Sequence, residues 1–191
     1  MARILRSLEY IARPWKNGGG TTRDIVTAPP GASLDTFDWR LSLAQVDRDG
    51  PFSRFDNVDR TLVLLSGAMT LHEGERQIHL ARNEPFAFAG ERAIEATVGG
   101  GATLDFNVMT RRGRAKHAAR RESFSQRSNI EASAASVLVI FALERGLIVD
   151  GERLDLHDTA IIDARRVSVA AAADSVAALV VEIVDIHPNV L

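Results

Sequence analysis

The chain has 191 residues, of which 46% are hydrophobic and 25% are charged, so it is long enough for one large or two small globular domains. It has no cysteine, which excludes disulfides, thiolate metal sites and cysteine nucleophiles. Its 23 basic and 25 acidic residues give a net charge of −2, whereas a nucleic-acid-binding protein of this size is usually strongly basic.

The N-terminal ten residues have neither the apolar stretch nor the small-residue cleavage site of a signal peptide. No apolar run approaches the roughly 20 residues that a membrane-spanning helix needs. We therefore expect a cytoplasmic globular protein with no membrane partner.

The segment 14–24 (PWKNGGGTTRD) is rich in glycine and in polar residues. Three consecutive glycines permit positive φ angles and a close approach of the backbone to a ligand. The lysine precedes the glycines, so the segment is not a phosphate-binding Walker A loop. Lys16, Asn17 and Arg23 flank the glycines and favour a contact with a small molecule or an anion. A flexible entry loop is the alternative.

The hydrophobic pattern of the rest of the chain is typical of β-strands. Residues 39–46 (WRLSLAQV) and 104–109 (LDFNVM) alternate, and the first of these runs predicts a half-buried strand. Residues 61–65 (TLVLL) and 137–141 (VLVIF) are continuous apolar runs that suit fully buried strands. Short strands punctuated by proline and glycine predict an all-β sandwich or barrel.

Two of these strands carry polar residues on one face. Arg40 and Ser42 share a face of one strand, and Asp105 and Asn107 share a face of another. Burying such groups costs a few kcal/mol unless each has a partner. If the sheets close into a barrel, these faces would form a polar pocket in which an arginine binds a carboxylate through two hydrogen bonds. An internal Arg–Asp structural pair, such as Arg40 with Asp105, is the alternative.

A turn-rich connection, residues 49–53 (DGPFS) followed by Asp59 and Arg60, joins two apolar strands. Loops at strand ends are where binding residues concentrate, so this connection is a candidate binding segment. A plain connection with an Asp59–Arg60 pair at the surface is the alternative.

Metal and nucleophile sites have little support in the sequence. His72 and His79 flank the EGER turn at 73–76 without a third ligand nearby, and no G-x-S-x-G motif is present. We therefore expect no metal and assign no catalytic residue.

The chain contains an internal repeat. The run 62–64 precedes EGER, and the run 139–141 precedes DGER (150–153) at an offset of 77. At an offset of 75 the strand 104–109 matches 179–184, so that Val180 and Glu182 replace Asp105 and Asn107. Each EGER or DGER would supply the tight turn of a hairpin. The repeat predicts two copies of one β unit, of which only the first has the polar pair.

The segment 111–121 (RRGRAKHAARR) has six basic residues and no acidic one. It suits either a phosphate-contacting patch or a solvated segment between domains. The solvated segment is favoured, because no aromatic residue is present to stack on bases.

Five segments resemble the HutD/Ves family of bacteria, which is often encoded beside the histidine-utilisation enzymes. They occur in the family's order and are PWKNGGGTTRD (14–24), FDWRLSLAQVDRDGPFSRF (37–55), DRTLVLLSG (59–67), NEPFAFAG (83–90) and LDFNVMTRRG (104–113).

The resemblance implies a bicupin, an all-β chain with two double-stranded β-helix (jelly-roll-like) barrels. We place the first barrel, which carries the candidate site, at 1–112. A linker follows at 113–135, and a second, smaller barrel at 136–191 could be completed by strands from the N-terminal part.

The resemblance also implies a site with no metal and no cofactor, since residues 50–60 lack the histidines that many cupins carry. The family is thought to bind a small carboxylate metabolite of histidine breakdown, N-formylglutamate being the usual suggestion, and to restrain flux through that pathway. The ligand-binding positions carried over are Lys16, Asn17, Arg23, Arg40, Ser42, Ser53, Arg60, Asp105, Asn107 and Arg111.

Our leading hypothesis is a metal-independent, metabolite-binding regulator of histidine utilisation. Arg40 or Arg60 would bind a carboxylate, Asn107 and the amides of the glycine loop would bind neutral polar atoms, and Asp105 would orient an arginine or accept an N–H. The second barrel would be structural or form a homodimer or partner surface. The alternatives are a metal-free cupin enzyme (isomerase, hydrolase or lyase) with Asp105 as general base, and a DNA-contacting regulator that uses the basic segment.

Overall fold

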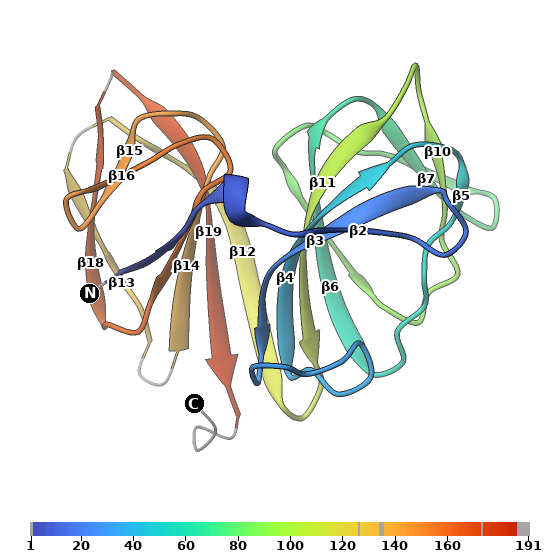
Figure 1. The fold of residues 1–191 in the computed structure, drawn as a ribbon, viewed down its shortest axis with the longest axis horizontal. Helices are drawn as coiled ribbons and strands as arrows, with labels where there is room; N and C mark the ends of the chain where they lie inside the picture. Colours follow the sequence, from blue (N-terminus) through green and yellow to red (C-terminus); the bar gives the residue numbers. More distant parts are fainter. Residues whose placement is uncertain (1, 126, 134–135, 173, 187–191) are drawn as a thin grey trace. The chain divides into compact units, whose positions relative to one another are not determined.

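The protein is built almost entirely from β-strands. A computed structural model describes residues 2–125, 127–133, 136–172 and 174–186 (Figure 1). The chain divides into two compact units. We call Ile11–Arg114 the continuous unit, and the described residues of 1–10 and 115–191 the discontinuous unit. None of the helices in the described ranges is long and apolar enough to cross a membrane.

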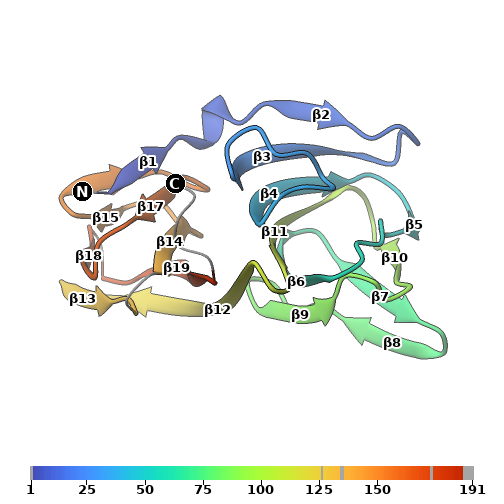
Figure 2. The same cartoon turned by 90° about the horizontal axis from the view of Figure 1, so that it is seen from below.

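The continuous unit contains a six-stranded and a four-stranded antiparallel sheet. The larger has the order β2-β3-β4-β11-β6-β9 and the smaller β5-β10-β7-β8. Figure 2 shows β3 and β4 on one side of this unit and β9 and β8 on the other. The strands are β2 (Ala12–Pro14), β3 (Gly20–Ala28), β4 (Trp39–Val46), β5 (Gly50–Pro51), β6 (Val58–Ser66), β7 (Met69–Glu73), β8 (Arg76–His79), β9 (Pro85–Ala89), β10 (Glu95–Val98) and β11 (Thr103–Arg111).

The discontinuous unit has the sheet orders β1-β17-β14-β19-β12 and β13-β18-β15-β16. A short 3-10 turn, η1 (Ser7–Glu9), follows its first strand. The strands are β1 (Arg3–Leu5), β12 (Ala115–Phe124), β13 (Ser128–Glu131), β14 (Ser136–Ala142), β15 (Leu147–Val149), β16 (Glu152–Leu154), β17 (Thr159–Ile162), β18 (Arg166–Ala171) and β19 (Val176–Asp185).

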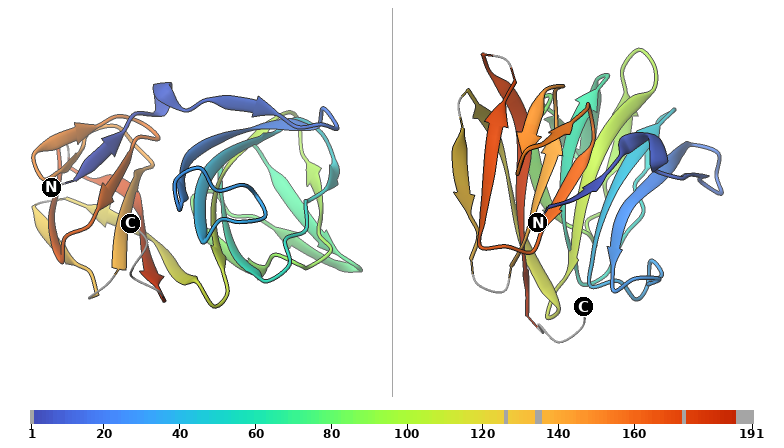
Figure 3. Two further views of the ribbon diagram at one scale, coloured as in Figure 1. Left: turned by 60° about the horizontal axis from the view of Figure 1, so that its bottom comes forward. Right: turned by 60° about the vertical axis from the view of Figure 1, so that its left-hand side comes forward.

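The two units repeat one strand order, which confirms the internal repeat. The run β4-β11-β6-β9 corresponds to β12-β19-β14-β17, and β5-β10-β7-β8 corresponds to β13-β18-β15-β16. In the left view of Figure 3 the blue and green strands of the continuous unit curl round on one another. Each unit therefore has two sheets whose inner faces can enclose an interior.

The predicted offset of 77 is wrong by one residue at the hairpins. The first hairpin turns at Gly74 and Glu75 and the second at Asp150 and Gly151, which is an offset of 76. Gly74 has positive φ in its turn, and both Asp150 and Gly151 have positive φ in theirs. The two turns thus differ in type although their motifs match. Aligning the two copies by their motifs would therefore be wrong by one residue in the strands, and such an error assigns each side chain to the opposite face of the sheet.

The interior of the discontinuous unit is apolar where the continuous unit is polar. Asp105 lies opposite Leu64, and Val180 lies opposite Ile140, so the offset of 75 holds at this strand. Val180 and Ile140 are fully buried in the apolar core of their unit. The prediction that the polar pair belongs to the first copy alone is confirmed at the Asp105 position.

The predicted linker at 113–135 is wrong for most of its length. It contains β12 and β13, and β12 pairs with β19 along ten residues. Residues 126, 134 and 135 of that segment, and 173 and 187–191 of the predicted second barrel, lie outside the described residues. A run of basic side chains is typical of a solvated connection, but it also suits an edge strand, where exposed charge is common, and β12 is such a strand.

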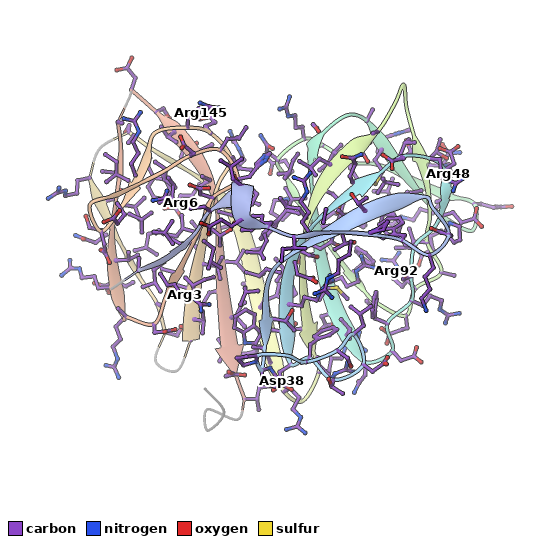
Figure 4. All side chains as sticks on the ribbon, in the orientation of Figure 1. Arg3, Arg6, Asp38, Arg48, Arg92 and Arg145 are labelled. Carbon is purple, nitrogen blue, oxygen red and sulfur yellow. The ribbon has the colours of Figure 1, made fainter. Side chains whose placement is uncertain are left out.

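Residues 2–10 belong to the discontinuous unit. The boundary that places them in the first barrel is therefore wrong, whereas the expectation that a strand from the N-terminal part completes the second copy is confirmed. β1 pairs with β17, and the buried carboxylate of Asp158 holds the residues that follow. It accepts hydrogen bonds from the Ser7 amide (2.8 Å) and from Arg6 Nη1 (2.9 Å); Arg6 is labelled in Figure 4. The Tyr10 hydroxyl lies 2.8 Å from Thr159 Oγ1.

Strand β4 has the predicted bounds, but it is buried on both faces rather than half-buried. Leu41 and Leu43 are buried on one face. Arg40 and Ser42 on the other face are 9% and 2% exposed. Alternating polarity therefore marks two buried surfaces of different chemistry, of which the polar one forms the candidate site.

Candidate functional site

A cavity of about 560 Å³ opens into the continuous unit. Its inner wall is made by alternate residues of β3, β4, β6 and β11, because alternate side chains of a strand point to the same face. Its rim is made by β2, by the loop between β2 and β3, and by the segment after β5. The lining residues are Arg13, Pro14, Trp15, Lys16, Asn17, Thr22, Asp24, Leu34, Arg40, Ser42, Ala44, Val46, Pro51, Phe52, Ser53, Phe55, Arg60, Asp105, Asn107 and Met109.

Arg60, Asn107 and Asp105 form a hydrogen-bonded chain in the cavity wall. Arg60 Nη2 donates to Asn107 Oδ1 (2.9 Å), and Asn107 Nδ2 donates to Asp105 Oδ1. Because a guanidinium can only donate, this chain fixes which end of the Asn107 amide faces each partner. Arg60 Nη1 donates to the carbonyl oxygen of Ser53 (3.2 Å).

Two polar atoms of this chain are left without partners. Arg60 Nε and Asp105 Oδ2 are buried and have no hydrogen-bond partner within the described part of the protein. Arg60 is 7% exposed and Asp105 is 1% exposed. An unsatisfied buried donor or acceptor costs about 1–3 kcal/mol, and a charged one costs more. The cavity wall thus contains a buried donor and a buried acceptor that no protein group satisfies.

Burial shifts the pKa of both charged groups towards neutrality. It raises the pKa of Asp105 to about 7, although the charge of Arg60 and the hydrogen bond from Asn107 oppose the rise. It lowers the pKa of Arg60 to about 10, against the attraction of Asp105, and the nearby charge of Arg40 adds to this lowering. Asp105 therefore titrates near neutral pH, whereas Arg60 keeps its charge there.

Three phenyl rings surround the Arg60 guanidinium. Its Cζ lies 5.5 Å from the ring centres of Phe52 and Phe55 and 5.0 Å from that of Phe88. Cation–π contacts of this kind favour a charged arginine in a site that excludes water. The rings partly offset the cost of burial and hold the guanidinium in one orientation.

The second cavity arginine, Arg40, is held by Asp24 of β3. Arg40 Nε donates to Asp24 Oδ1 (2.7 Å), and Nη2 is paired with the same oxygen. Nη1 lies 3.9 Å from the sulfur of Met109. An internal Arg–Asp pair is therefore present, as the alternative interpretation predicted, but the partner of Arg40 is Asp24 and not Asp105. The predicted surface pair of Asp59 with Arg60 is wrong, since Asp59 instead accepts from Arg112 Nε (2.7 Å).

The glycine-rich segment forms the hairpin between β2 and β3 at the rim. Gly18 has a φ of 66°, and a Cβ at Gly20 would lie 2.2 Å from the carbonyl oxygen of Gln45 on β4. Arg48, labelled in Figure 4, donates to the carbonyl oxygen of Asn17 (2.6 Å). The glycines are therefore needed for a turn and for a close approach between strands. They do not line the cavity, so the prediction that their amides bind the ligand is not supported.

Eight of the ten predicted ligand-binding residues line the cavity, and two do not. Arg23 is exposed on the opposite face of β3, beside a separate hollow of about 210 Å³. Arg111 donates to the carbonyl oxygens of Phe37 and Asp35 (2.9 Å each) and holds the loop before β4. The eight that line the cavity are Lys16, Asn17, Arg40, Ser42, Ser53, Arg60, Asp105 and Asn107.

Sequence reasoning missed Asp24 and the apolar part of the cavity. Asp24 lies next to Arg23, and alternation along β3 would have chosen between them once the strand was recognised. Phe52, Phe55 and Met109 lie beside predicted residues but carry no signal of their own, because apolar residues next to strands are usually core.

Three of the six basic residues in the segment 111–121, namely Arg112, Arg114 and Arg120, pair with acidic groups. Arg112 contacts Asp59 and Glu91, and Arg120 contacts Glu122. These contacts favour the interpretation of the segment as ordinary structured surface over a phosphate-binding patch.

No group of three or more His, Cys, Asp or Glu side chains that could hold a metal ion occurs in the ranges that the structure describes. His72 and His79 each contact a threonine hydroxyl, of Thr97 (3.0 Å) and Thr70 (2.9 Å) respectively.

Comparison with known proteins gives one family and two kinds of structural relative. A family model described as HutD matches residues 7–180. An uncharacterized 21.2 kDa protein in the hutC 3′ region of Pseudomonas putida is 37% identical over 162 residues, which cover 81% of this chain and 83% of that protein.

Two solved structures are similar over nearly the whole chain. HutD from Pseudomonas fluorescens SBW25 is 30% identical with a TM-score of 0.83, and the match covers 98% of this chain and 100% of that one. YhhW from Escherichia coli is 9% identical with a TM-score of 0.72 and covers 98% and 99%. The second likeness shows the fold alone, which is that of the cupins.

Proposed function

Because the chain belongs to the HutD family, we propose that it binds a small carboxylate metabolite, without a metal ion, in the cavity of the continuous unit. The relative in the hutC 3′ region favours an intermediate of histidine degradation, such as N-formylglutamate. The protein would then regulate histidine utilisation by sensing this metabolite.

The observation that carries the proposal is the pair of unpartnered buried atoms, Arg60 Nε and Asp105 Oδ2. An anionic oxygen accepting from Arg60 Nε would make a charge-assisted hydrogen bond, which is about twice as strong as a neutral one. Four basic side chains line the cavity against two acidic ones, Asp24 and Asp105, so its charge also favours an acid.

The rest of the lining suits the body of such a ligand. Ser42 and Asn107 are buried polar side chains that can bind neutral oxygen and N–H groups. Phe52, Leu34 and Met109 offer apolar surface to methylene groups. Lys16 is exposed at the rim, where it can attract a second carboxylate.

We expect N-formyl-L-glutamate to stabilise the protein in a thermal-shift assay with and without a chelator. At 100 times its Kd it should stabilise the fold by about 2.7 kcal/mol, a shift of several degrees. Glutamate, urocanate, imidazolone propionate and formate serve as comparisons. The variant Arg23→Gln, on β3 outside the cavity, should bind as the wild type does. A shift that needs added divalent metal, or none with any of these acids, would contradict the proposal.

The titration of Asp105 near neutral pH supports a second candidate, a metal-free enzyme with Asp105 as general base. An enzyme would convert its acid to a product detectable by NMR, and Asp105→Asn would lose turnover while keeping affinity. A binding protein would return the acid unchanged after prolonged incubation with a stoichiometric amount of protein.

A further inference from the structure

We infer that the cavity takes up a proton together with its acidic ligand, and that Asp105 holds this proton. The inference rests on the proposed function and concerns the regulation of the same site. It makes acid binding sensitive to pH in the range where the ligand itself does not titrate.

The argument begins with the charges deep in the cavity, which already balance. Arg60 is connected to Asp105 through Asn107, and Arg40 is paired with Asp24. Each arginine thus has one carboxylate. A ligand carboxylate that accepts from Arg60 Nε would leave this buried cluster with one net negative charge, which a low-dielectric site strongly disfavours.

The neighbours of Asp105 offer no other way to balance this charge. On β11 it faces Asn107, which is neutral; on β6 it faces Leu64 and, further along, Arg60. On β4 it lies opposite Ala44, with Arg40 four pairs further along.

The remaining charged groups of the lining lie farther out. Asp24 of β3 is committed to Arg40. Arg13 and Lys16 at the rim are exposed, so water and salt screen their charges.

Asp105 can accept the proton with little rearrangement. Its Oδ1 is used by Asn107, but Oδ2 has no partner among the residues described. A proton on Oδ2 turns this unpaired acceptor into a donor, which can bind the ligand carboxylate beside Arg60. The titration of Asp105 at about pH 7 means that the uptake costs little near neutrality.

The experiment is calorimetry of the full chain with formate and with N-formyl-L-glutamate, whose acid groups are ionised throughout pH 6–8. Titrations in buffers of different ionisation enthalpy give the number of protons taken up. We expect close to one proton at pH 8 and close to none at pH 6, because Asp105 is largely protonated there before binding. Kd should rise about tenfold from pH 6 to pH 8.

The variant Asp105→Asn separates proton uptake from direct recognition. The amide keeps an acceptor for Asn107 and places an NH₂ group where Oδ2 lies, so it imitates the protonated acid. We expect binding with no proton uptake, a Kd that is constant across pH 6–8, and affinity at pH 8 at least equal to that of the wild type. Asp59→Asn, outside the cavity on β6, should keep the wild-type proton uptake.

The outcomes distinguish this inference from the proposed function. Acid binding without proton uptake at pH 8, or uptake that persists in Asp105→Asn, would overturn the inference and leave the binding function standing. Absence of binding at every pH would overturn both.

Discussion

Replacing Arg60 with methionine should weaken the binding of N-formyl-L-glutamate by about 100-fold, as measured by calorimetry at pH 7. The substitution removes the unpaired Nε donor, and a charge-assisted hydrogen bond contributes about 1.5–3 kcal/mol. Methionine fits among the three phenyl rings that contact Arg60, so the fold should persist. Asp105, deprived of its counter-charge, should become protonated at neutral pH.

One further variant shows whether the geometry of Arg60 or merely its charge matters, and a second serves as a control. Arg60→Lys keeps the positive charge but replaces the planar guanidinium, with its Nε–H donor, by an ammonium group. Its affinity should therefore lie between those of Arg60→Met and the wild type. Arg23→Gln is the control: it removes an arginine from β3 of the same sheet, on the face opposite the cavity, and should bind normally. Equal affinity of wild type and Arg60→Met would place the ligand elsewhere.

Replacing Asp158 with alanine should destabilise the discontinuous unit by about 3 kcal/mol. The buried carboxylate accepts from the Ser7 amide, from Arg6 and from the Asp155 amide, and their loss leaves buried donors unpaired. The melting temperature should fall by roughly 6–12 °C, and residues 1–10 should become sensitive to trypsin at Arg3 and Arg6.

Asp155→Ala is the matched control, because Asp155 is exposed and its backbone amide stays in place to donate. It should melt within about a degree of the wild type. A normal melting temperature in Asp158→Ala would mean that the N-terminal residues contribute little to this unit.

The contribution of Asp158 should also depend on pH. Burial by itself raises its pKa, but the hydrogen bonds from Ser7, Arg6 and Asp155 outweigh burial and hold the pKa below its usual range. The stability that a carboxylate with a lowered pKa supplies is complete above its unfolded-state pKa and is lost as the pH falls through the folded value. The difference between wild type and Asp158→Asn should therefore be largest near pH 7 and shrink below about pH 4.

Many features of the fold could be predicted from the sequence because they depend on alternation along a strand. Strand β4 has the predicted bounds, and the runs 61–65, 104–109 and 137–141 all lie within buried strands. The repeat was visible because its hairpin turns need glycine. The HutD family is confirmed, whereas the division into two cupin barrels stays a prediction.

By itself, the sequence determined that Asp105 and Asn107 share one face of a strand and that Arg40 and Ser42 share one face of another, because side chains alternate along a strand whatever its neighbours are. That these faces point inward was decided by the closure of the sheets. Only the tertiary structure decided the partners of these side chains, because these depend on strand register. Register places Met109 opposite both Arg40 and Arg60. From these positions Arg40 on β4 reaches Asp24 on β3, while Arg60 on β6 reaches Asn107 on β11. The two unpaired atoms that define the candidate site exist only because of that register, which no local pattern in the sequence encodes.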